Sequence, residues 1–395
     1  MKKIFLVLCL VFSFQLNCFA KTGISFIYIN GSNNNDAKMK NWYEDGVTKL
    51  HPYLKKEFEN NVLAQKYFLK NGQYFINERP NIFFWGDKSH EDLSFVEKNL
   101  TISKSFSSWF AYQIRSALTK FLHDAIWVQK YRNMLPILDD LHQVVITESE
   151  KGNKVVLYGY SAGSFVTYEY LLTRIPYINV VDFFNNVDVS QAEKDFVAKH
   201  PMKNTCMNAL GQNLAVFSMA GHIVPNKNEE LFKTNYMNLN KITDAVCAPN
   251  HTVKGIVNFA SPLVLFYSDL SDPNYDLTYY NRLLFKYIIE NDMFWITVNY
   301  RADPLGFPGG RNLTIEEMES AANIDIEPHA GFVYDQSDTW GRNSALATHT
   351  SYWATRSIFS KAVVRAYVNG YRYQYDDNFK SKTVKKIQKR LNITP

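Results

Sequence analysis

The chain has few cysteines, and none of them has the spacing of a metal or redox site. Of its four cysteines, Cys9 and Cys18 lie within the first twenty residues. Neither a CxxC nor an HExxH motif occurs, so the sequence predicts no metal site. Internal repeats and low-complexity segments are also absent, which excludes solenoid and low-complexity architectures.

Concentrated charge of one sign is missing as well. The formal net charge is +5, and no arginine-rich stripe with interleaved aromatic residues occurs. Nucleic-acid binding is therefore not predicted. Hydrophobic residues make up 46% of the 395 positions, which is enough for a globular protein with a sizeable core.

The first twenty residues have the pattern of an export signal. Two lysines precede an apolar run from Ile4 to about Leu16, and Cys18-Phe19-Ala20 follows directly before Lys21. Small residues at the first and third of these positions are typical of a signal-peptide cleavage site. We predict that residues 1–20 are removed and that the protein is secreted or periplasmic. An uncleaved membrane anchor is the alternative.

The two remaining cysteines predict a disulfide in an exported chain. A bond between Cys206 and Cys247 would close a loop of about forty residues and contribute about 3–4 kcal/mol in the chain-entropy model. Two separate buried thiols are the alternative. Both cysteines lie in residues 177–253, which interrupt the alternation of strands and helices. We interpret this region as a cap or insertion within one domain spanning 21–395, or as an ordinary additional strand and helix.

Short apolar runs rich in β-branched and aromatic residues alternate with longer amphipathic segments. The runs are residues 24–29, 82–85, 155–158, 256–259 and 294–298. Because they lack polar alternation, they predict strands buried on both faces. Helices are expected at residues 105–127, 135–148 and 352–368, the last ending at Asn369-Gly370. The predicted fold class is α/β, with a mainly parallel central sheet flanked by helices.

The strongest local motif is Gly159-Tyr160-Ser161-Ala162-Gly163, which lies between the apolar run 155–158 and a helical stretch at 164–172. A serine in this position would occupy a sharp strand-to-helix turn, which the flanking glycines permit. The helix start would direct N–H groups at a developing oxyanion, so we expect the Ala162 amide to be one donor. Ser161 is the candidate nucleophile, with a plain tight turn as the alternative.

A serine nucleophile needs a base, and the base needs an acid that orients it. In this type of site both follow the serine along the chain. Asp303 lies in the loop that follows the run 294–298, at the expected carboxyl end of a strand, and is the candidate acid. His349 precedes the last long helix, where a loop histidine can reach the serine. The substitutes are Asp325, Asp335 and Asp338 for the acid and His329 for the base.

A second oxyanion donor is expected after the first strand, where Asn30-Gly31-Ser32 begins a loop of small and polar residues. Glycine allows the backbone to approach a substrate closely, so the amide of Ser32 or Gly31 is the candidate. An asparagine-rich surface turn is the alternative.

Together, these motifs resemble the α/β-hydrolase superfamily, specifically its secreted lipase-like members. The resemblance rests on the Ser161 motif, on Asn299 to Pro304, on Phe259-Ala260-Ser261-Pro262 and on His349-Thr350-Ser351-Tyr352-Trp353. It covers most of residues 24–368 and implies a catalytic triad of Ser161, His349 and Asp303. It departs at the first strand, where lipases commonly have His-Gly and this chain has Asn30-Gly31.

The resemblance implies hydrolysis of a carboxylic ester, from a small molecule or a lipid, through an acyl-enzyme intermediate and without cofactor or metal. Acyl transfer, peptidase activity and a non-catalytic binding protein of the same fold are the alternatives. The basic segment 380–390 favours a solvated terminal helix, with transient contact with an anionic membrane surface as the alternative. The sequence predicts no oligomeric state.

Overall fold

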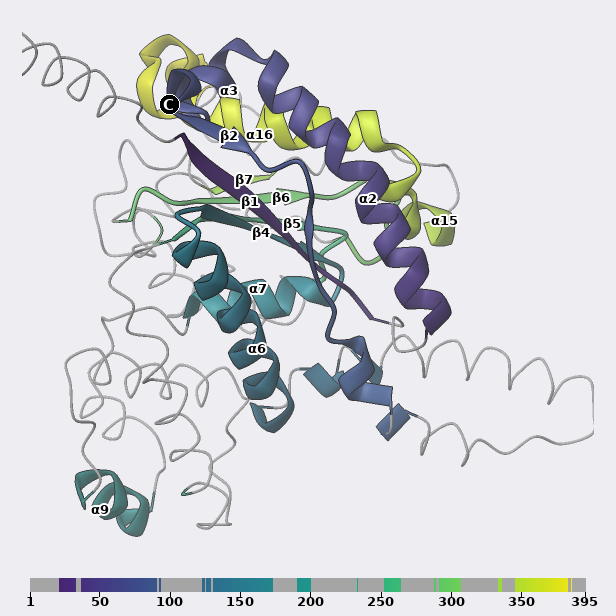
Figure 1. The fold of residues 1–395 in the computed structure, drawn as a ribbon, viewed down its shortest axis with the longest axis vertical. Helices are drawn as coiled ribbons and strands as arrows, with labels where there is room; N and C mark the ends of the chain where they lie inside the picture. Colours follow the sequence, from purple (N-terminus) through teal and green to yellow (C-terminus); the bar gives the residue numbers. More distant parts are fainter. Residues whose placement is uncertain are drawn as a thin grey trace, which may run out of the picture.

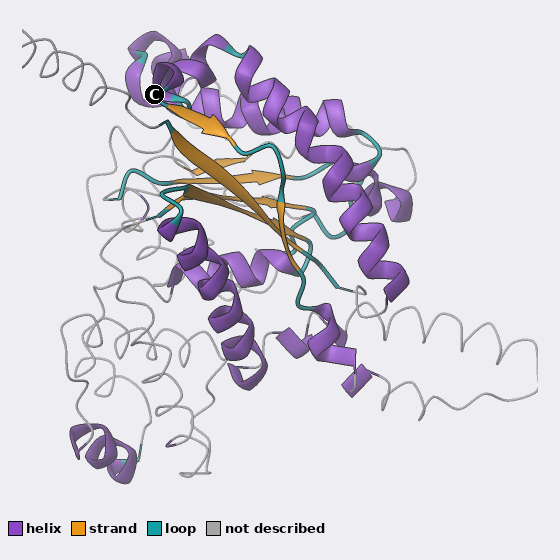
Figure 2. Ribbon diagram, in the orientation of Figure 1, coloured by secondary structure: helices purple, strands orange, loops and turns teal. Residues whose placement is uncertain are grey.

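The computed structural model describes residues 21–32, 37–90, 92–93, 123–124, 126–128, 131–172, 190–199, 252–263, 291–306, 333–335 and 345–382, with 233, 288 and 385. Its centre is a seven-stranded sheet in which all paired strands are parallel. Helices cover both faces of this sheet (Figures 1 and 2). The predicted α/β fold class is confirmed.

The sheet has the order β2-β1-β4-β5-β6-β7, and β3 also pairs with β1. The strands are β1 (Thr22–Ile29), β2 (Tyr74–Ile76), β3 (Asn81–Phe83), β4 (Lys154–Tyr160), β5 (Val253–Phe259), β6 (Phe294–Val298) and β7 (Val333–Asp335). The five predicted apolar runs correspond to β1, β3, β4, β5 and β6. Strands β2 and β7 were not predicted; β3 is equally short, but its apolar run continues to Trp85 and so shows a pattern.

The strand registers bring four strand ends to one edge of the sheet. Ile29 pairs with Gly159, Gly159 with Asn258, and Asn258 with Thr297. The residues that follow β1, β4, β5 and β6 therefore lie next to one another at the carboxyl edge. In open α/β sheets this edge is where ligands bind.

Two groups of helices sandwich the sheet (Figure 1). One face carries α2 (Ala37–Asn60), α3 (Val62–Tyr67) and α16 (Arg356–Tyr375), and the other carries α6 (Tyr131–Glu150) and α7 (Gly163–Leu172). The predicted helix at 135–148 corresponds to α6. The short helix α15 (Ala345–Thr350) and the turn η4 (Ser351–Trp353) precede α16, and α9 (Gln191–Lys199) is a described part of the predicted cap.

Aromatic side chains fill the layer between the sheet and helices α2 and α16. Phe68 lies at the centre of this layer, with ring centroids 4.3 Å from Phe58, 5.1 Å from Tyr367 and 6.2 Å from Phe26 and Phe294. Each buried aromatic ring removes roughly 150–250 Å² of surface from water. This packing fixes the C-terminal helix on the sheet.

The C-terminal helix is longer than predicted. We expected it to end at Asn369-Gly370, but α16 continues to Tyr375. A glycine inside a helix costs about 1 kcal/mol relative to alanine. Tyr371 and Tyr375 stack on Tyr67 of α3, with centroid distances of 5.0 and 6.0 Å. This aromatic packing offsets the cost of the glycine, so the helix continues beyond Gly370.

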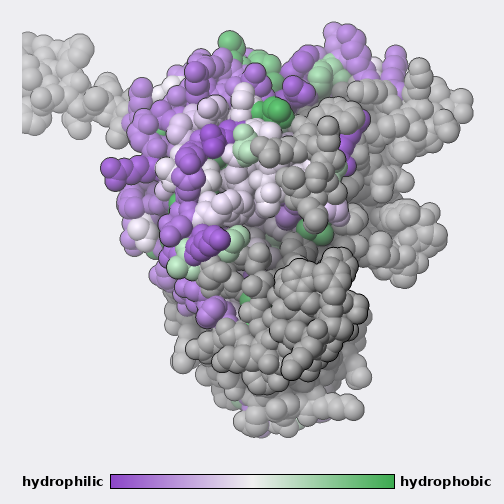
Figure 3. Space-filling view, turned by 90° about the vertical axis from the view of Figure 1, so that its right-hand side faces the viewer, coloured by the Kyte–Doolittle hydropathy of each residue, from purple (hydrophilic) through white to green (hydrophobic). Residues whose placement is uncertain are grey.

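Among the described residues few large apolar side chains are exposed. In Figure 3 the coloured part of the face shown is mostly hydrophilic, with small separate hydrophobic patches. None of the described helices combines the length and apolarity needed to cross a membrane. Several predictions fall outside the described residues. They concern the signal peptide at 1–20, Cys206 and Cys247, most of 177–253 and of 105–127, and most of the basic tail.

Candidate active site

Ser161 occupies the turn between β4 and α7 and has a φ of +50°. Non-glycine residues rarely adopt this left-handed conformation, so the surrounding structure must hold it. The Ser161 N–H donates to the carbonyl oxygen of Phe259 at 2.9 Å, and the Ser164 hydroxyl donates to the carbonyl oxygen of Ser161 at 2.6 Å. Gly163 is required because a Cβ there would lie 2.6 Å from the carbonyl oxygens of Ile29 and Asn30.

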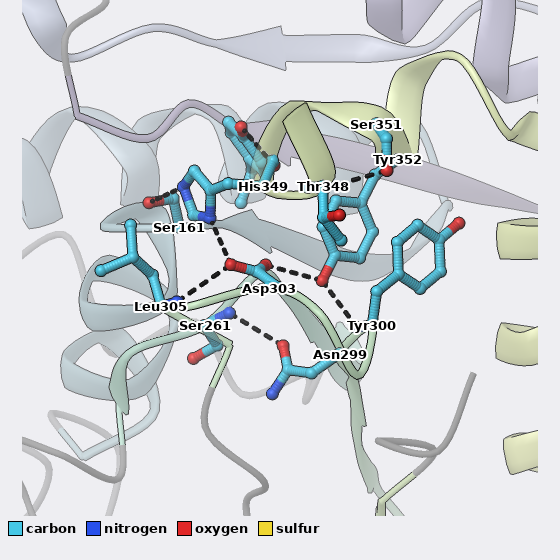
Figure 4. Close-up of polar contacts among 11 residues, drawn as sticks. Ser161, Ser261, Asn299, Tyr300, Asp303, Leu305, Thr348, His349, Ser351 and Tyr352 are labelled. Carbon is cyan, nitrogen blue, oxygen red and sulfur yellow. Dashed lines mark hydrogen bonds and ion pairs between the residues drawn. The ribbon is translucent and has the colours of Figure 1, made fainter. Parts of the chain in front are cut away.

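The structure brings Ser161, His349 and Asp303 into one hydrogen-bonded chain (Figure 4). Nε2 of His349 lies 3.1 Å from Oγ of Ser161, and Nδ1 lies 2.9 Å from Oδ1 of Asp303. An ionised carboxylate only accepts, so Nδ1 carries the proton and Nε2 is the atom that accepts from the serine hydroxyl. The three residues come from three separate parts of the chain.

Asp303 is buried, and every described contact to its carboxylate is a hydrogen-bond donor. Besides His349, the Leu305 N–H donates to Oδ1 at 3.0 Å and the Tyr352 hydroxyl donates to Oδ2 at 2.8 Å. Burial by itself raises the pKa of Asp303, but the bonds from His349, Leu305 and Tyr352 together hold that pKa below its ordinary value. Asp303 is therefore ionised at neutral pH.

His349 lies in the last turn of α15, whereas the sequence analysis expected it in a loop. Tyr160, the residue before the serine, holds it on two sides. The Tyr160 hydroxyl donates to the carbonyl oxygen of His349 at 3.0 Å, and the two rings stack with centroids 5.6 Å apart. Burial, and then the charge of Asp303, raise the pKa of Tyr160 far above its usual value, so this contact stays neutral.

Asn30 begins the loop after β1, and Trp85 fixes it with two hydrogen bonds. The Trp85 backbone N–H donates to Oδ1 of Asn30, and its indole Nε1–H donates to the carbonyl oxygen of Asn30, both at 2.7 Å. Nδ2 of Asn30 donates to the Gly31 carbonyl oxygen at 2.9 Å. In a trans peptide C=O and N–H point in opposite directions, so the Ser32 N–H points away from the Asn30 side chain.

The candidate oxyanion donors lie on either side of the serine. Gly31 packs directly against Ser161, so the loop after β1 passes beside the nucleophile. The Ser32 hydroxyl is buried, and none of the described residues forms a hydrogen bond with it. Ala162 directly precedes α7, in the first turn of which N–H groups have no partner within the helix.

Three residues around the site were not found from the sequence as functional candidates: Tyr160, Tyr352 and Asn299. Asn299 accepts through Oδ1 from the Ser261 N–H at 3.0 Å, which joins the loops after β5 and β6. Tyr352 follows His349 by three residues, a spacing that places two side chains on one side of a helical turn. That spacing was the available signal for Tyr352.

Four further residues are the substitutes that the sequence offered for the acid and the base. Asp335 is the last residue of β7, while Asp325, Asp338 and His329 lie outside the described residues. Among the described residues, no group of three or more histidine, cysteine or acidic side chains is arranged to hold a metal ion.

No family model, curated protein or solved structure matches this chain. The chemistry of the site is therefore argued from its own geometry. That geometry consists of an alcohol, an imidazole and an ionised carboxylate in sequence, at the carboxyl edge of a parallel sheet.

Proposed function

We propose that this protein is a serine hydrolase of the α/β-hydrolase type that cleaves carboxylic esters. The observation that carries the proposal is the continuous hydrogen-bonded chain from Oγ of Ser161 through His349 to Asp303. The strained turn at Ser161 supports it, because a strand-to-helix elbow exposes a nucleophile above the sheet. The chain order of serine, acid and histidine is the order of that superfamily.

In the proposed reaction, Oγ of Ser161 attacks the ester carbonyl while Nε2 of His349 takes its proton. Asp303 stabilises the imidazolium that forms, and the amides of Ala162 and of Ser32 or Gly31 stabilise the oxyanion. His349 then gives the proton to the leaving alcohol, which leaves an acyl ester on Ser161. Water attacks this ester with His349 as the base, releases the carboxylic acid and restores the serine hydroxyl.

The proposed substrate is an ester of a small molecule or a lipid, and the reaction requires no cofactor or metal. Acyl transfer to another alcohol would use the same residues and differ only in the acceptor. Export through residues 1–20 and the Cys206–Cys247 disulfide remain predictions from the sequence. Export determines where the enzyme works, and neither export nor the disulfide changes its chemistry.

A fluorophosphonate probe tests the nucleophile directly, because it reacts with an activated serine. We expect the wild type to be labelled and Ser161→Ala to be unlabelled. Ser360→Ala is the matched control, since Ser360 is a buried serine of α16 outside the proposed site. This control variant should be labelled like the wild type.

A panel of p-nitrophenyl esters with increasing acyl length tests turnover and defines the preferred chain. His349→Ala should lower kcat on the best ester by about a thousandfold or more. A folded wild-type protein that neither reacts with the probe nor hydrolyses any ester of the panel would contradict the proposal and favour a binding function.

A further inference from the structure

Tyr352 contacts the oxygen of Asp303 that His349 does not use. The Tyr352 hydroxyl lies 2.8 Å from Oδ2, whereas Nδ1 of His349 lies 2.9 Å from Oδ1 (Figure 4). His349 ends α15 and Tyr352 lies in the adjoining turn η4. One short helical segment therefore binds both oxygens of the carboxylate.

Tyr352 is itself fixed by the loop that carries the acid. Its hydroxyl oxygen accepts from the Tyr300 N–H at 2.8 Å, and its ring stacks on the Tyr300 ring with centroids 4.1 Å apart. Tyr300 begins the turn that presents Asp303, since the Asp303 N–H donates to the Tyr300 carbonyl oxygen at 2.9 Å. The hydrogen bonds thus form a closed connection between the loop that carries Tyr300 and Asp303 and the segment of α15 and η4 that carries His349 and Tyr352, which we call the histidine segment.

This connection determines the direction of the Tyr352 hydroxyl. A backbone N–H only donates, so the Tyr352 oxygen must accept from Tyr300, and its own proton is then directed to Asp303. A donor to the charged form of a carboxyl stabilises that form. With donors on both oxygens, the Asp303 carboxylate is also held against rotation about its Cβ–Cγ bond.

We propose that Tyr352 is a positioning residue for the triad, which holds the Asp303 carboxylate in the orientation that His349 requires and stabilises its charge. This inference rests on the proposed function. The titratable groups that face Asp303 are His349 and Tyr352 from the histidine segment and Tyr160 from β4. Burial, and then the charge of Asp303, raise the pKa of Tyr352 well above its usual value, so Tyr352 acts as a neutral donor.

Tyr352→Phe removes this donor and retains the ring. We expect kcat on the best ester to fall by about tenfold or more, with KM little changed, because a bond to a charged group is lost. A carboxylate with one donor fewer is protonated more easily, so the titration of Asp303 should move to higher pH. Carboxyl ¹³C NMR should show a higher pKa for Asp303, with the signal assigned by Asp303→Asn.

Tyr170→Phe is the matched control for loss of a buried tyrosine hydroxyl. The Tyr170 hydroxyl lies 2.9 Å from Nδ1 of His142, on the opposite face of the sheet from the histidine segment. This variant should lower the free energy of unfolding without moving the Asp303 titration. Thermal unfolding of both variants measures how much of each effect is structural.

A double-mutant cycle separates positioning from general destabilisation. In an Asp303→Asn background, Tyr352→Phe should cost much less activity than in the wild type. An unchanged Asp303 titration, or an equal loss of activity in both backgrounds, would overturn the role of Tyr352. Absence of Ser161-dependent labelling would instead refute the proposed function, and the NMR titration, which needs no turnover, would still decide whether Tyr352 stabilises the carboxylate.

Discussion

Gly31 lies so close to Ser161 that position 31 has no room for a side chain. A Cβ atom on Gly31 would lie 2.8 Å from Cβ of Ser161 and 2.8 Å from the carbonyl oxygen of Tyr160. Neither neighbour is the end of a flexible side chain, so neither can move aside at little cost. The loop after β1 and the serine turn therefore pack as one unit, and the position of one determines the position of the other.

Gly31→Ala should consequently impair activity. The added methyl group must displace the Ser161 turn or the loop after β1. A displacement of about 1 Å in an active site can cost about a hundredfold in rate. We expect kcat/KM on the best p-nitrophenyl ester to fall by about that factor. The purified variant should retain a cooperative thermal transition.

Gly152→Ala is a suitable control for this experiment. Gly152 has a φ of +76° and open space around its Cα, in the turn between α6 and β4. Alanine there is strained in the left-handed region and costs about 1 kcal/mol of stability. If Gly31→Ala kept wild-type kcat/KM, or if Gly152→Ala lost as much, the close packing at Ser161 would not matter for activity.

Asp303→Asn removes the charge that orients and stabilises His349. The amide can present an N–H to Nδ1, which would leave the proton of the imidazole on Nε2. A protonated Nε2 cannot accept the hydrogen bond from Ser161. We expect kcat to fall by roughly a thousandfold to ten-thousandfold. Asp376→Asn changes a half-buried aspartate whose side chain caps the Phe379 N–H, and it should retain wild-type kcat. A loss of less than tenfold for Asp303→Asn would exclude Asp303 as the acid.

The sequence predicted the parts of this fold whose pattern is local. Strands such as β4 and β6 are buried on both faces, and each shows an unbroken apolar run. The turn at Ser161 also depends on neighbouring residues, because the glycines that permit it lie two positions away on either side. Asp303 could be placed because it lies in the loop that follows one of the predicted strands.

Contacts between distant segments could not be read from the sequence. The bond from Tyr352 to Asp303 joins residues 49 apart, and that from Trp85 to Asn30 joins residues 55 apart. Both depend on the strand register and on how the loops pack, which no local pattern encodes. The same reason explains why Gly370 was misread as a helix end, since the rings that extend α16 pack on another helix.

Trp85→Phe tests the loop in which this chain departs from the lipase pattern. The variant loses the indole N–H that binds the Asn30 carbonyl oxygen but keeps the backbone bond to the Asn30 side chain. We expect about a tenfold lower kcat, because one hydrogen bond that fixes the loop after β1 is lost. The ratio of oxoester to thionoester turnover should also fall, since sulfur accepts hydrogen bonds weakly and this ratio reports the oxyanion donors.

Trp127→Phe provides the matched comparison. The indole rings of Trp85 and Trp127 stack with centroids 6.4 Å apart. The Trp127 indole N–H donates to Asp92 at 2.6 Å and not to the loop after β1. Both variants lose an indole hydrogen bond, but only Trp85→Phe should change the oxoester preference. An equal change in both would show that the effect comes from general loosening of this region.

His51 is a buried histidine whose neutral ring forms two hydrogen bonds. Nε2 donates to the carbonyl oxygen of Asn77 at 2.8 Å, so Nδ1 is left to accept from the Tyr28 hydroxyl at 3.1 Å. Burial, with a smaller effect from the charge of Lys55, lowers the pKa of His51 and outweighs the opposing effects of Asn77 and Glu78. Protonation of the ring would remove Nδ1 as an acceptor, and the Tyr28 hydroxyl would have to turn and accept instead.

This histidine should make the fold less stable in mild acid. The pKa of His51 is lower in the folded than in the unfolded chain, so the unfolded chain binds more protons below about pH 6.5. The stabilisation is complete above that pH and is lost as the pH falls towards the folded pKa. His51→Gln lacks this group, so its deficit in free energy of unfolding, measured in urea, should shrink between about pH 8 and about pH 5. A deficit that stays constant or grows over this interval would show that the folded protein does not disfavour the charged ring.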